Sequence, residues 1–318
     1  MRLFLDKLLA ILFVGALLCS CNSSLKLKKF PEAELSADTY EVKQDVKLSL
    51  SVIETGYSTT PEVFMFKGGR WFKKRKIAHI SVLVQHPLGD FLFDTGLGSK
   101  VSDDVKNHFS AIQRTGSKHI KFKTVKETLD SNDYHQDSLA FILLSHLHWD
   151  HAGGVEDFIT PLLYTTKVEY DHAFSEQSEE SYFIKEQFDS INVQWKFLAF
   201  DSVKYKVFDT SLDLFNDGTV ILVPLYGHTN GSIGMFVNLP SGTRYFFIGD
   251  AAWALEAITG LREKHPIPRK QVDTNRSKVQ NQLVLLHYLQ KKDPNLILVP
   301  SHDHQVVKGL AHFPLVEK

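Results

Sequence analysis

Twelve residues, LLSHLHWDHAGG (Leu143–Gly154), place three histidines and an aspartate directly after an apolar run. The run LAFILLS (Leu139–Ser145) is apolar on both faces, which is typical of a strand inside a sheet that is covered on both sides. In the extended segment that follows, side chains two residues apart point the same way, so the first two histidines can bind one ion. The aspartate and the third histidine come after a turn, so they can bind a second ion. The four residues are His146, His148, Asp150 and His151. Imidazole and carboxylate donors in this spacing indicate Zn²⁺ or a similar divalent ion.

Three further metal-binding side chains each follow another apolar run. His228 comes directly after VILVPL, Asp250 ends YFFIGD, and His302 follows LILVPS. Because loops at strand ends converge on functional sites, we expect these three side chains to lie beside the first cluster. His304 is the alternative at the last position, although it lies further from the strand end.

The rest of the chain from Val46 onward alternates short β-type runs with fewer helical segments. Strands are predicted at 46–54, 77–86, 90–96, 139–145, 195–200, 204–209, 218–225, 232–239, 243–250 and 296–301. Helices are predicted at 124–130 and 276–290, and the segment 164–189 reads mostly as helix. Turns are expected at Gly68-Gly69 and Pro240–Gly242. Trp71 and Phe72 are expected on a buried hairpin face, and the alternative is that they are exposed beside the site, where they would suit an acyl chain. The pattern predicts a single α/β domain over residues 46–318, with sheets inside and helices outside.

The composition is that of an ordinary globular protein: 318 residues, 43% hydrophobic, 23% charged, with a formal net charge of -1. Near-neutral charge gives no electrostatic reason to expect nucleic acid as a partner. Both cysteines, Cys19 and Cys21, lie close to the N-terminus. This position excludes a disulfide within the domain, a thiolate metal site and a cysteine nucleophile, so any metal must be held by nitrogen and oxygen.

The N-terminal segment predicts export. Arg2 and Lys7 precede the apolar run Leu8–Leu18, which is short of the about 20 residues that span a bilayer and fits a secretory signal. The sequence LCSC that ends the run resembles a bacterial lipobox in which Cys21 is acylated. A plain signal peptide and an uncleaved anchor are the alternatives.

Residues 1–21 are therefore expected to be a lipoprotein-type signal peptide, and residues 22–45, which are polar and rich in Lys and Glu, a tether. The protein is expected at the bacterial cell envelope, anchored to the membrane by its N-terminal lipid and facing the periplasm. Asn22 after the acylated cysteine favours the outer membrane.

The order His-x-His-x-Asp-His, Gly-His-Thr, Gly-Asp and a final His resembles the metallo-β-lactamase-fold hydrolase superfamily, from Val46 to His302. The resemblance implies a four-layer αββα sandwich of two mixed β-sheets with helices on the outer faces and the site at one edge of the sheets. It also implies that Asp94, in FDTG, supports the first metal-binding loop from outside the ligand set.

The resemblance implies two divalent metal ions. One would be bound by His146, His148 and His228, the other by Asp150, His151 and His302, with Asp250 bridging both. Zinc is expected first from the ligand types, with manganese, iron and cobalt as alternatives. Water between two cations is readily deprotonated, so a bridging hydroxide is expected to attack a carbonyl carbon or phosphorus, with Asp150 transferring a proton.

Two residues narrow the branch of the superfamily. Asp250 argues against a true β-lactamase, which lacks this aspartate, and His148 argues against the diiron oxygen-reducing branch. The amino-acid sequence around the site is most similar to that of N-acyl-homoserine lactonases, so the expected substrate is a small-molecule lactone or other carboxylic ester. A glyoxalase II-type thioesterase, an organophosphate hydrolase and a non-catalytic metal-binding lipoprotein are the alternatives.

One position departs from the lactonase pattern. Those enzymes typically carry a tyrosine three residues after the bridging aspartate, where this chain has Trp253. An indole N–H donates one hydrogen bond but cannot accept or relay a proton. Either the substrate differs, or another group such as Tyr226 takes the place of the tyrosine hydroxyl at the substrate carbonyl. The alternative for Trp253 itself is that it only packs at the start of a helix.

Overall fold

The computed structural model describes residues 24–25, 40–159, 162–176, 181–190 and 192–318. The predicted signal peptide, with Cys21, and most of the predicted tether lie outside the described residues. Among the described residues, no helix has the length and hydropathy needed to cross a membrane.

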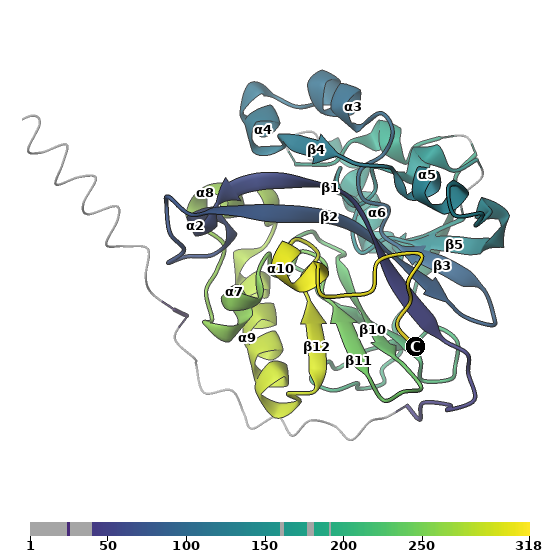
Figure 1. The fold of residues 1–318 in the computed structure, drawn as a ribbon. Helices are drawn as coiled ribbons and strands as arrows, with labels where there is room; N and C mark the ends of the chain where they lie inside the picture. Colours follow the sequence, from purple (N-terminus) through teal and green to yellow (C-terminus); the bar gives the residue numbers. More distant parts are fainter. Residues whose placement is uncertain (1–23, 26–39, 160–161, 177–180, 191) are drawn as a thin grey trace, which may run out of the picture.

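Two mixed β-sheets form the centre of the molecule (Figure 1). The first has seven strands in the order β4 (His119–Lys121), β1 (Ser49–Pro61), β2 (Lys74–Gln85), β3 (Asp90–Phe93), β5 (Leu139–Leu143), β6 (Leu162–Thr166) and β7 (Gln194–Leu198). The second has five, in the order β12 (Leu296–Val299), β11 (Arg244–Phe247), β10 (Ile233–Asn238), β9 (Val220–Pro224) and β8 (Leu212–Asp213). Parallel pairing runs from β3 through β5 and β6 to β7 and joins β11 to β12, while the other pairs are antiparallel.

Alternating side chains on the strands divide the interior into layers. On β10, Met235 and Val237 pack between the two sheets, whereas Phe236 points to the opposite face. On β3, Phe91 and Phe93 pack between the sheets, and Leu92 points outward. Because successive side chains in a strand point to opposite faces, each sheet has apolar surface on both faces. Each face must therefore be covered by another layer of the protein.

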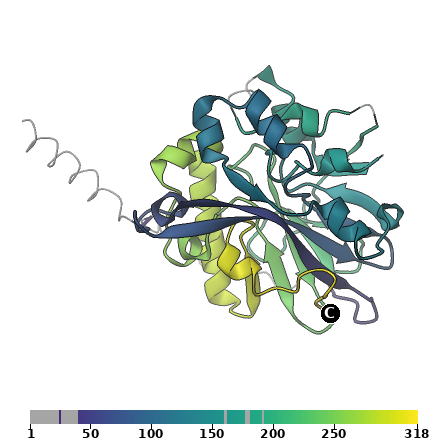
Figure 2. The same cartoon turned by 45° about the horizontal axis from the view of Figure 1, so that its top comes forward.

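Helices cover the two outer faces, so the fold is a four-layer αββα sandwich, as the sequence predicted (Figures 1 and 2). The outer face of the second sheet packs on α7 (Leu255–Thr259) and α9 (Arg276–Lys292). The outer face of the first sheet packs on α5 (Val125–Asp130) and α6 (Lys167–Ala173). The remaining helices are α2 (Glu62–Met65), α3 (Val101–His108), α4 (Ala111–Gly116), α8 (Pro266–Val272) and α10 (His304–Val307), with 3-10 turns η1 (Gln136–Ser138), η2 (Val155–Asp157) and η4 (Lys185–Gln187).

Two secondary-structure predictions are wrong. The described residues of 164–189, which are 164–176 and 181–189, are not mostly helical. They begin inside β6, where Tyr-Thr-Thr at 164–166 pairs with β7, continue as the seven-residue α6, which Thr166 caps, and include η4. Residues 204–209 form a tight turn in which Lys206 has φ 53°, with Tyr205 and Phe208 paired across it.

The prediction that Trp71 and Phe72 are buried is also wrong. Their side chains are 39% and 103% exposed. The connection between β1 and β2 contains α2 and extends beyond the paired strands, which end at Pro61 and Lys74. The two aromatic residues therefore lie at the end of this connection and outside the sheet.

A buried carboxylate joins this connection to the start of α9. Glu263 accepts hydrogen bonds from Lys67 Nζ (3.0 Å) and from Arg276 Nε (2.7 Å). Burial alone would raise the pKa of Glu263, but the hydrogen bonds from Arg276 and Lys67 outweigh it and lower the pKa to about 2.

Glu263→Gln is expected to destabilise the protein by about 1.5–3 kcal/mol at neutral pH, because a charged acceptor of several hydrogen bonds is lost. The folded-state pKa is lowered from 4.5, so the stabilisation is present above pH 4.5 and is lost as the pH falls toward 2. Urea unfolding of both proteins across this range should show the difference shrinking with acid. A difference that stays constant from neutral pH down to about pH 2 would contradict the assignment.

Candidate metal centre

The four strand ends that the sequence singled out meet in one place. The loop with His146, His148, Asp150 and His151 follows β5, and His228, Asp250 and His302 follow β9, β11 and β12. All seven side chains are buried. The two sheets face each other, so loops from both reach the same edge of the sandwich.

Close contacts link the side chains into one cluster. His228 Nε2 lies 3.0 Å from His148 Nδ1 and 3.3 Å from Asp250 Oδ2. On the other side, Asp250 Oδ1 lies 3.2 Å from His151 Nε2 and 3.1 Å from His302 Nε2. The Asp250 carboxylate thus lies between two groups of histidines, as a bridging ligand must.

Donor atoms in this cluster form three groups in which all atoms lie within 4.8 Å of one another. The groups are His146, His148 and His228; His146, His151 and Asp250; and His79, Asp150 and His302. His79 was not predicted, although a histidine inside the apolar strand β2 was a signal for it. His304 is in none of these groups, and its Nδ1 lies 3.1 Å from Glu54 Oε1.

Several buried donor atoms in the cluster have no hydrogen-bond partner. They include Nε2 of His146, Nε2 of His151 and Oδ1 of Asp250. A buried polar atom without a partner costs free energy, and divalent cations bound in the cluster would satisfy all three. The residues present therefore fit divalent metal ions held by nitrogen and oxygen.

Asp94 orients the first loop from outside these groups. Its Oδ2 lies 2.7 Å from His151 Nδ1, and its Oδ1 accepts a hydrogen bond from the backbone N–H of Ser145 (2.7 Å). Asp94 has φ 60°, a left-handed conformation that is uncommon for a residue with a side chain. A carboxylate on the non-ligating nitrogen of a histidine fixes the tautomer and the direction of the ring.

An equivalent contact for His228 was not predicted. Asp273, between α8 and α9, lies with Oδ1 2.9 Å from His228 Nδ1 and accepts a hydrogen bond from Lys264 Nζ (2.8 Å). Lys264 Nζ also donates to the backbone oxygen of Asp250 (2.8 Å). Burial opposes ionisation of Asp273, but Lys264 and His228 outweigh it and lower its pKa. Neither residue is near a recognisable motif, so the sequence carried no signal for them.

Asp273→Asn is expected to weaken metal binding by about 10- to 100-fold, because the ring of His228 loses its charged partner. Competition with a chelator of known affinity measures this change. Asp293→Asn is a suitable control, because Asp293 pairs with Arg244 outside the centre. Equal metal affinity of Asp273→Asn and the wild type would show that Asp273 does not support the centre.

A second unpredicted carboxyl group joins two ligand loops. Glu169, on α6, accepts hydrogen bonds from the backbone N–H groups of Leu147 (3.0 Å) and Gly231 (2.9 Å) and from Thr229 Oγ1 (2.6 Å). Burial raises its pKa to about 7, against the effect of these hydrogen bonds. It lies in the segment that was wrongly predicted to be mostly helical.

A cavity of about 720 Å³ opens beside the cluster. Its apolar walls include Phe64, Ile77, Ile112, Ile267 and Val272. Its lining also includes residues of the metal-binding cluster, namely His79, His148, Asp150, His228, Asp250 and His302. The metal centre is therefore accessible from a largely uncharged cavity.

Of the two candidates for substrate contact, only Trp253 lines this cavity. Its Nε1 donates a hydrogen bond to Asp250 Oδ2 (2.8 Å), so the indole does more than pack. Tyr226 is not among the lining residues, and Lys278 Nζ lies 5.7 Å from its ring centroid. Tyr182, which was not predicted, does line the cavity, and its hydroxyl donates to Gln271 Oε1 (2.9 Å).

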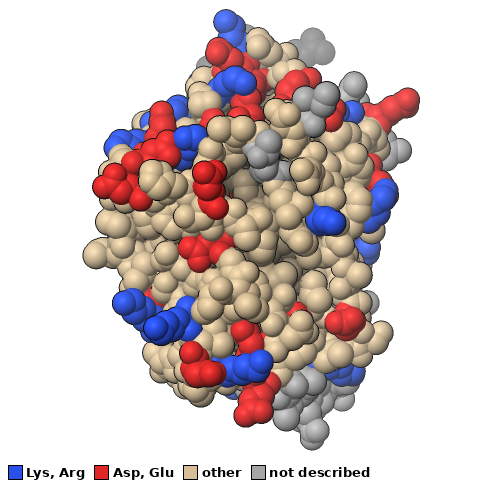
Figure 3. All heavy atoms as spheres, turned by 90° about the vertical axis from the view of Figure 1, so that its right-hand side faces the viewer, with Lys and Arg blue, Asp and Glu red and all other residues tan. Residues whose placement is uncertain are grey.

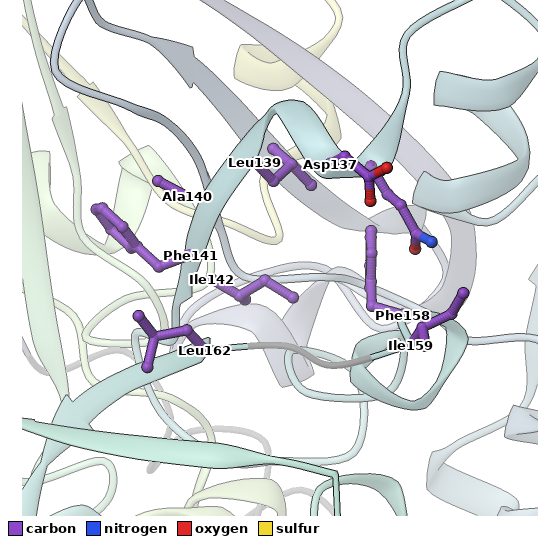
Figure 4. A pocket seen from close by; sticks show the side chains of 9 residues that line it. Asp137, Leu139, Ala140, Phe141, Ile142, Phe158, Ile159 and Leu162 are labelled. Atoms are coloured by element: carbon purple, nitrogen blue, oxygen red, sulfur yellow. The ribbon is translucent and has the colours of Figure 1, made fainter.

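A smaller cavity of about 210 Å³ lies beside the first half of β5 (Figure 4). β5 pairs with β6 only at Ile142 and Leu143, so the strands separate before these residues. The sides of the gap include Leu139, Phe158 and Leu162, and none of the predicted metal ligands lines it.

Charged side chains of both signs are intermixed on the face drawn in Figure 3. That face therefore presents no single-sign field that would steer a charged partner.

The chain belongs to the metallo-β-lactamase superfamily, whose family model matches residues 78–302. The N-acyl homoserine lactonase AttM of Agrobacterium fabrum (strain C58 / ATCC 33970) is 26% identical over 226 residues, which are 70% of this chain and 80% of that protein. The AttM protein of Rhizobium johnstonii is 26% identical over 176 residues, and the match covers 65% of its length, just under two thirds. The probable metallo-hydrolase Mb2322c of Mycobacterium bovis is 27% identical over 241 residues, 71% of this chain and 74% of that protein.

Solved structures show the same fold. An N-acyl homoserine lactone hydrolase with the product N-hexanoyl-L-homoserine bound at its catalytic metal centre superposes with a TM-score of 0.63 at 19% identity, covering 87% of this chain and 100% of that one. AidC, a dizinc quorum-quenching lactonase, has a TM-score of 0.52 at 16% identity, covering 84% and 92%. At these identities the likeness concerns the fold.

Proposed function

We propose that this protein is a dinuclear-metal-dependent hydrolase that opens a lactone or another carboxylic ester. The buried Asp250 carboxylate between two groups of histidines, beside a largely apolar cavity, carries this proposal. The family and the lactonases among its relatives support it.

His146, His148 and His228 would hold one ion. Asp150, His151 and His302 would hold the other, with Asp250 shared, because Asp250 Oδ1 lies 3.2 Å from His151 Nε2 and 3.1 Å from His302 Nε2, which is 3.5 Å from Asp150 Oδ2. Zinc is the first candidate. When bound, two divalent ions supply Lewis acidity and lower the pKa of water to near neutrality.

Asp150 is the side chain placed to handle a proton, because it belongs to the cluster and also lines the cavity. Burial opposes its ionisation, but the neighbouring His79, His151 and His302 outweigh it and lower its pKa. It is therefore a carboxylate at neutral pH and can accept a proton and pass it to the leaving alkoxide.

The cavity favours an ester with an apolar acyl group over a charged substrate. Phe64, Ile112 and Ile267 give it apolar walls, and among the described residues its lining contains no lysine or arginine that would bind a glutathione carboxylate. A thioesterase and a phosphotriesterase remain the competing activities in the test.

A substrate panel on the metal-loaded protein tests the proposal. It comprises N-acyl-homoserine lactones of several chain lengths, open-chain esters, S-lactoylglutathione and a phosphotriester. We expect the highest kcat/KM for a lactone or carboxylic ester. Preference for the thioester or phosphotriester would replace the proposed substrate class, and metal occupancy without any turnover would favour a binding protein.

Trp253→Phe is expected to lower kcat about tenfold or more, because a hydrogen bond to the charged Asp250 is lost while the aromatic ring is kept. Initial rates with the best substrate of the panel measure this effect. Tyr226→Phe should leave the rate unchanged, because Tyr226 does not line the cavity. Equal loss in the two variants would contradict the role given to Trp253.

We also propose that the protein is exported and held at the cell envelope by a lipid on Cys21, which rests on the N-terminal sequence. Labelling of bacterial cells with a fatty-acid analogue should mark the wild type and leave Cys21→Ser unmarked. Equal labelling of both proteins would contradict the lipid site.

A further inference from the structure

His79 is a buried histidine of β2 that belongs to none of the predicted ligand positions. Its side chain is 2% exposed, and its Nδ1 lies 3.1 Å from Asp150 Oδ2. Despite this short distance, Nδ1 has no directed hydrogen-bond partner. The atom therefore faces the Asp150 and His302 side of the cluster, in contact with Asp150 but not held by a hydrogen bond.

The predicted ligand histidines on this side share one arrangement. One ring nitrogen lies at hydrogen-bond distance from an oxygen outside the cluster, and the other nitrogen faces the cluster. For His151 the outer partner is Asp94 Oδ2 (2.7 Å), and for His302 it is the backbone oxygen of Ala78 (2.8 Å). Metal-ligating histidines in proteins almost always have such an outer partner.

His79 has the same arrangement. Its Nε2 lies 2.8 Å from Ser58 Oγ, while Nδ1 faces the cluster. His148 already shows that Nδ1 can be the inward nitrogen, since its Nδ1 lies 3.0 Å from His228 Nε2. The orientation of the imidazole is thus that of a ligand.

A second histidine just after β2 shows what a structural histidine looks like in this protein. His86 Nε2 lies 2.9 Å from Asp217 Oδ2, and its Nδ1 accepts a hydrogen bond from the backbone N–H of Leu88 (3.1 Å). Both nitrogens of His86 are used within the protein. His79 differs because one of its nitrogens is left for another partner.

We propose that His79 binds, through Nδ1, the metal ion held by Asp150 and His302. This inference rests on the metal centre of the proposed function and adds an eighth protein ligand to it. In this role Nε2–H of His79 donates to Ser58 Oγ, which fixes the ring. An extra imidazole at this position favours ions that accept more than four ligands.

Metal titration of His79→Phe tests the proposal, because phenylalanine keeps the ring volume and removes both nitrogens. The metal-free protein is titrated with Co²⁺, and visible absorption and elemental analysis report the two binding events. We expect the variant to bind one ion as the wild type does and to bind the other at least about tenfold more weakly, with altered absorption. His86→Phe, the matched control, should bind both ions normally.

Two outcomes separate this inference from the function on which it rests. A wild type that binds two ions, with unchanged affinity and absorption in His79→Phe, overturns the inference alone. A wild type that binds fewer than two ions overturns the proposed function as well.

The wild type provides a second test that does not depend on the folding of a variant. In crystals of the zinc-loaded full chain, anomalous scattering locates the ions. We expect one ion about 2.0–2.1 Å from His79 Nδ1, the length of a zinc–nitrogen bond. A separation of more than about 3 Å from both ions would show that His79 only lies against Asp150.

Discussion

Asp250→Asn is expected to reduce kcat/KM by more than the about 100-fold that follows the loss of an outer partner of a metal ligand. Asp250 lies within 3.3 Å of His228 on one side and within 3.2 Å of His151 on the other. An asparagine has nearly the same shape, but it lacks the charge and one of the two oxygen donors that a bridging position needs. Steady-state kinetics and the metal content of the same sample measure the effect.

Asp213→Asn is the matched control. Asp213 is also a buried aspartate, but it accepts a hydrogen bond from the backbone N–H of Gly218 (2.8 Å), away from the centre. We expect it to retain two ions and nearly full activity. Full activity of Asp250→Asn would show that Asp250 is not an essential bridging ligand.

Removal of the metal is expected to abolish hydrolysis. The seven predicted ligands are histidines and aspartates, so in this mechanism the activation of water depends on the ions that they hold. Dialysis against a chelator, followed by activity measurement, should give the rate of the buffer alone. Addition of Zn²⁺, Mn²⁺ or Co²⁺ should restore activity, and the ion that restores most identifies the preferred metal.

Circular dichroism of the chelated protein is the control for unfolding. Three large hydrophobic clusters fill the layers of the sandwich, so we expect the secondary structure to remain without metal. Undiminished turnover in the chelated protein would contradict a metal-dependent mechanism.

The strand ends made much of the centre predictable. An apolar run followed by histidine or aspartate marks a point where a buried strand reaches the surface, and this pattern occurs at His146, His228, Asp250 and His302. The long helix α9 and the strands on either side of it were predictable for the same reason, because local periodicity reflects burial on one face.

The supporting residues were not predictable, because their partners are distant in the chain. Asp273 pairs with a histidine 45 residues earlier, and Glu169 joins two loops 84 residues apart, at Leu147 and Gly231. Their identity as support depends on tertiary contacts that no local pattern records. The exposure of Trp71 and Phe72 was not predicted for a related reason. The sequence around them does not show where the pairing of β1 with β2 ends and how far the connection extends beyond it.

The metal content of the purified wild-type protein tests the central claim most directly. Elemental analysis after removal of loosely bound ions should give about two divalent ions per chain, shared among side chains from four separate loops. Less than one ion per chain in a protein that still turns over its ester substrate would contradict the account.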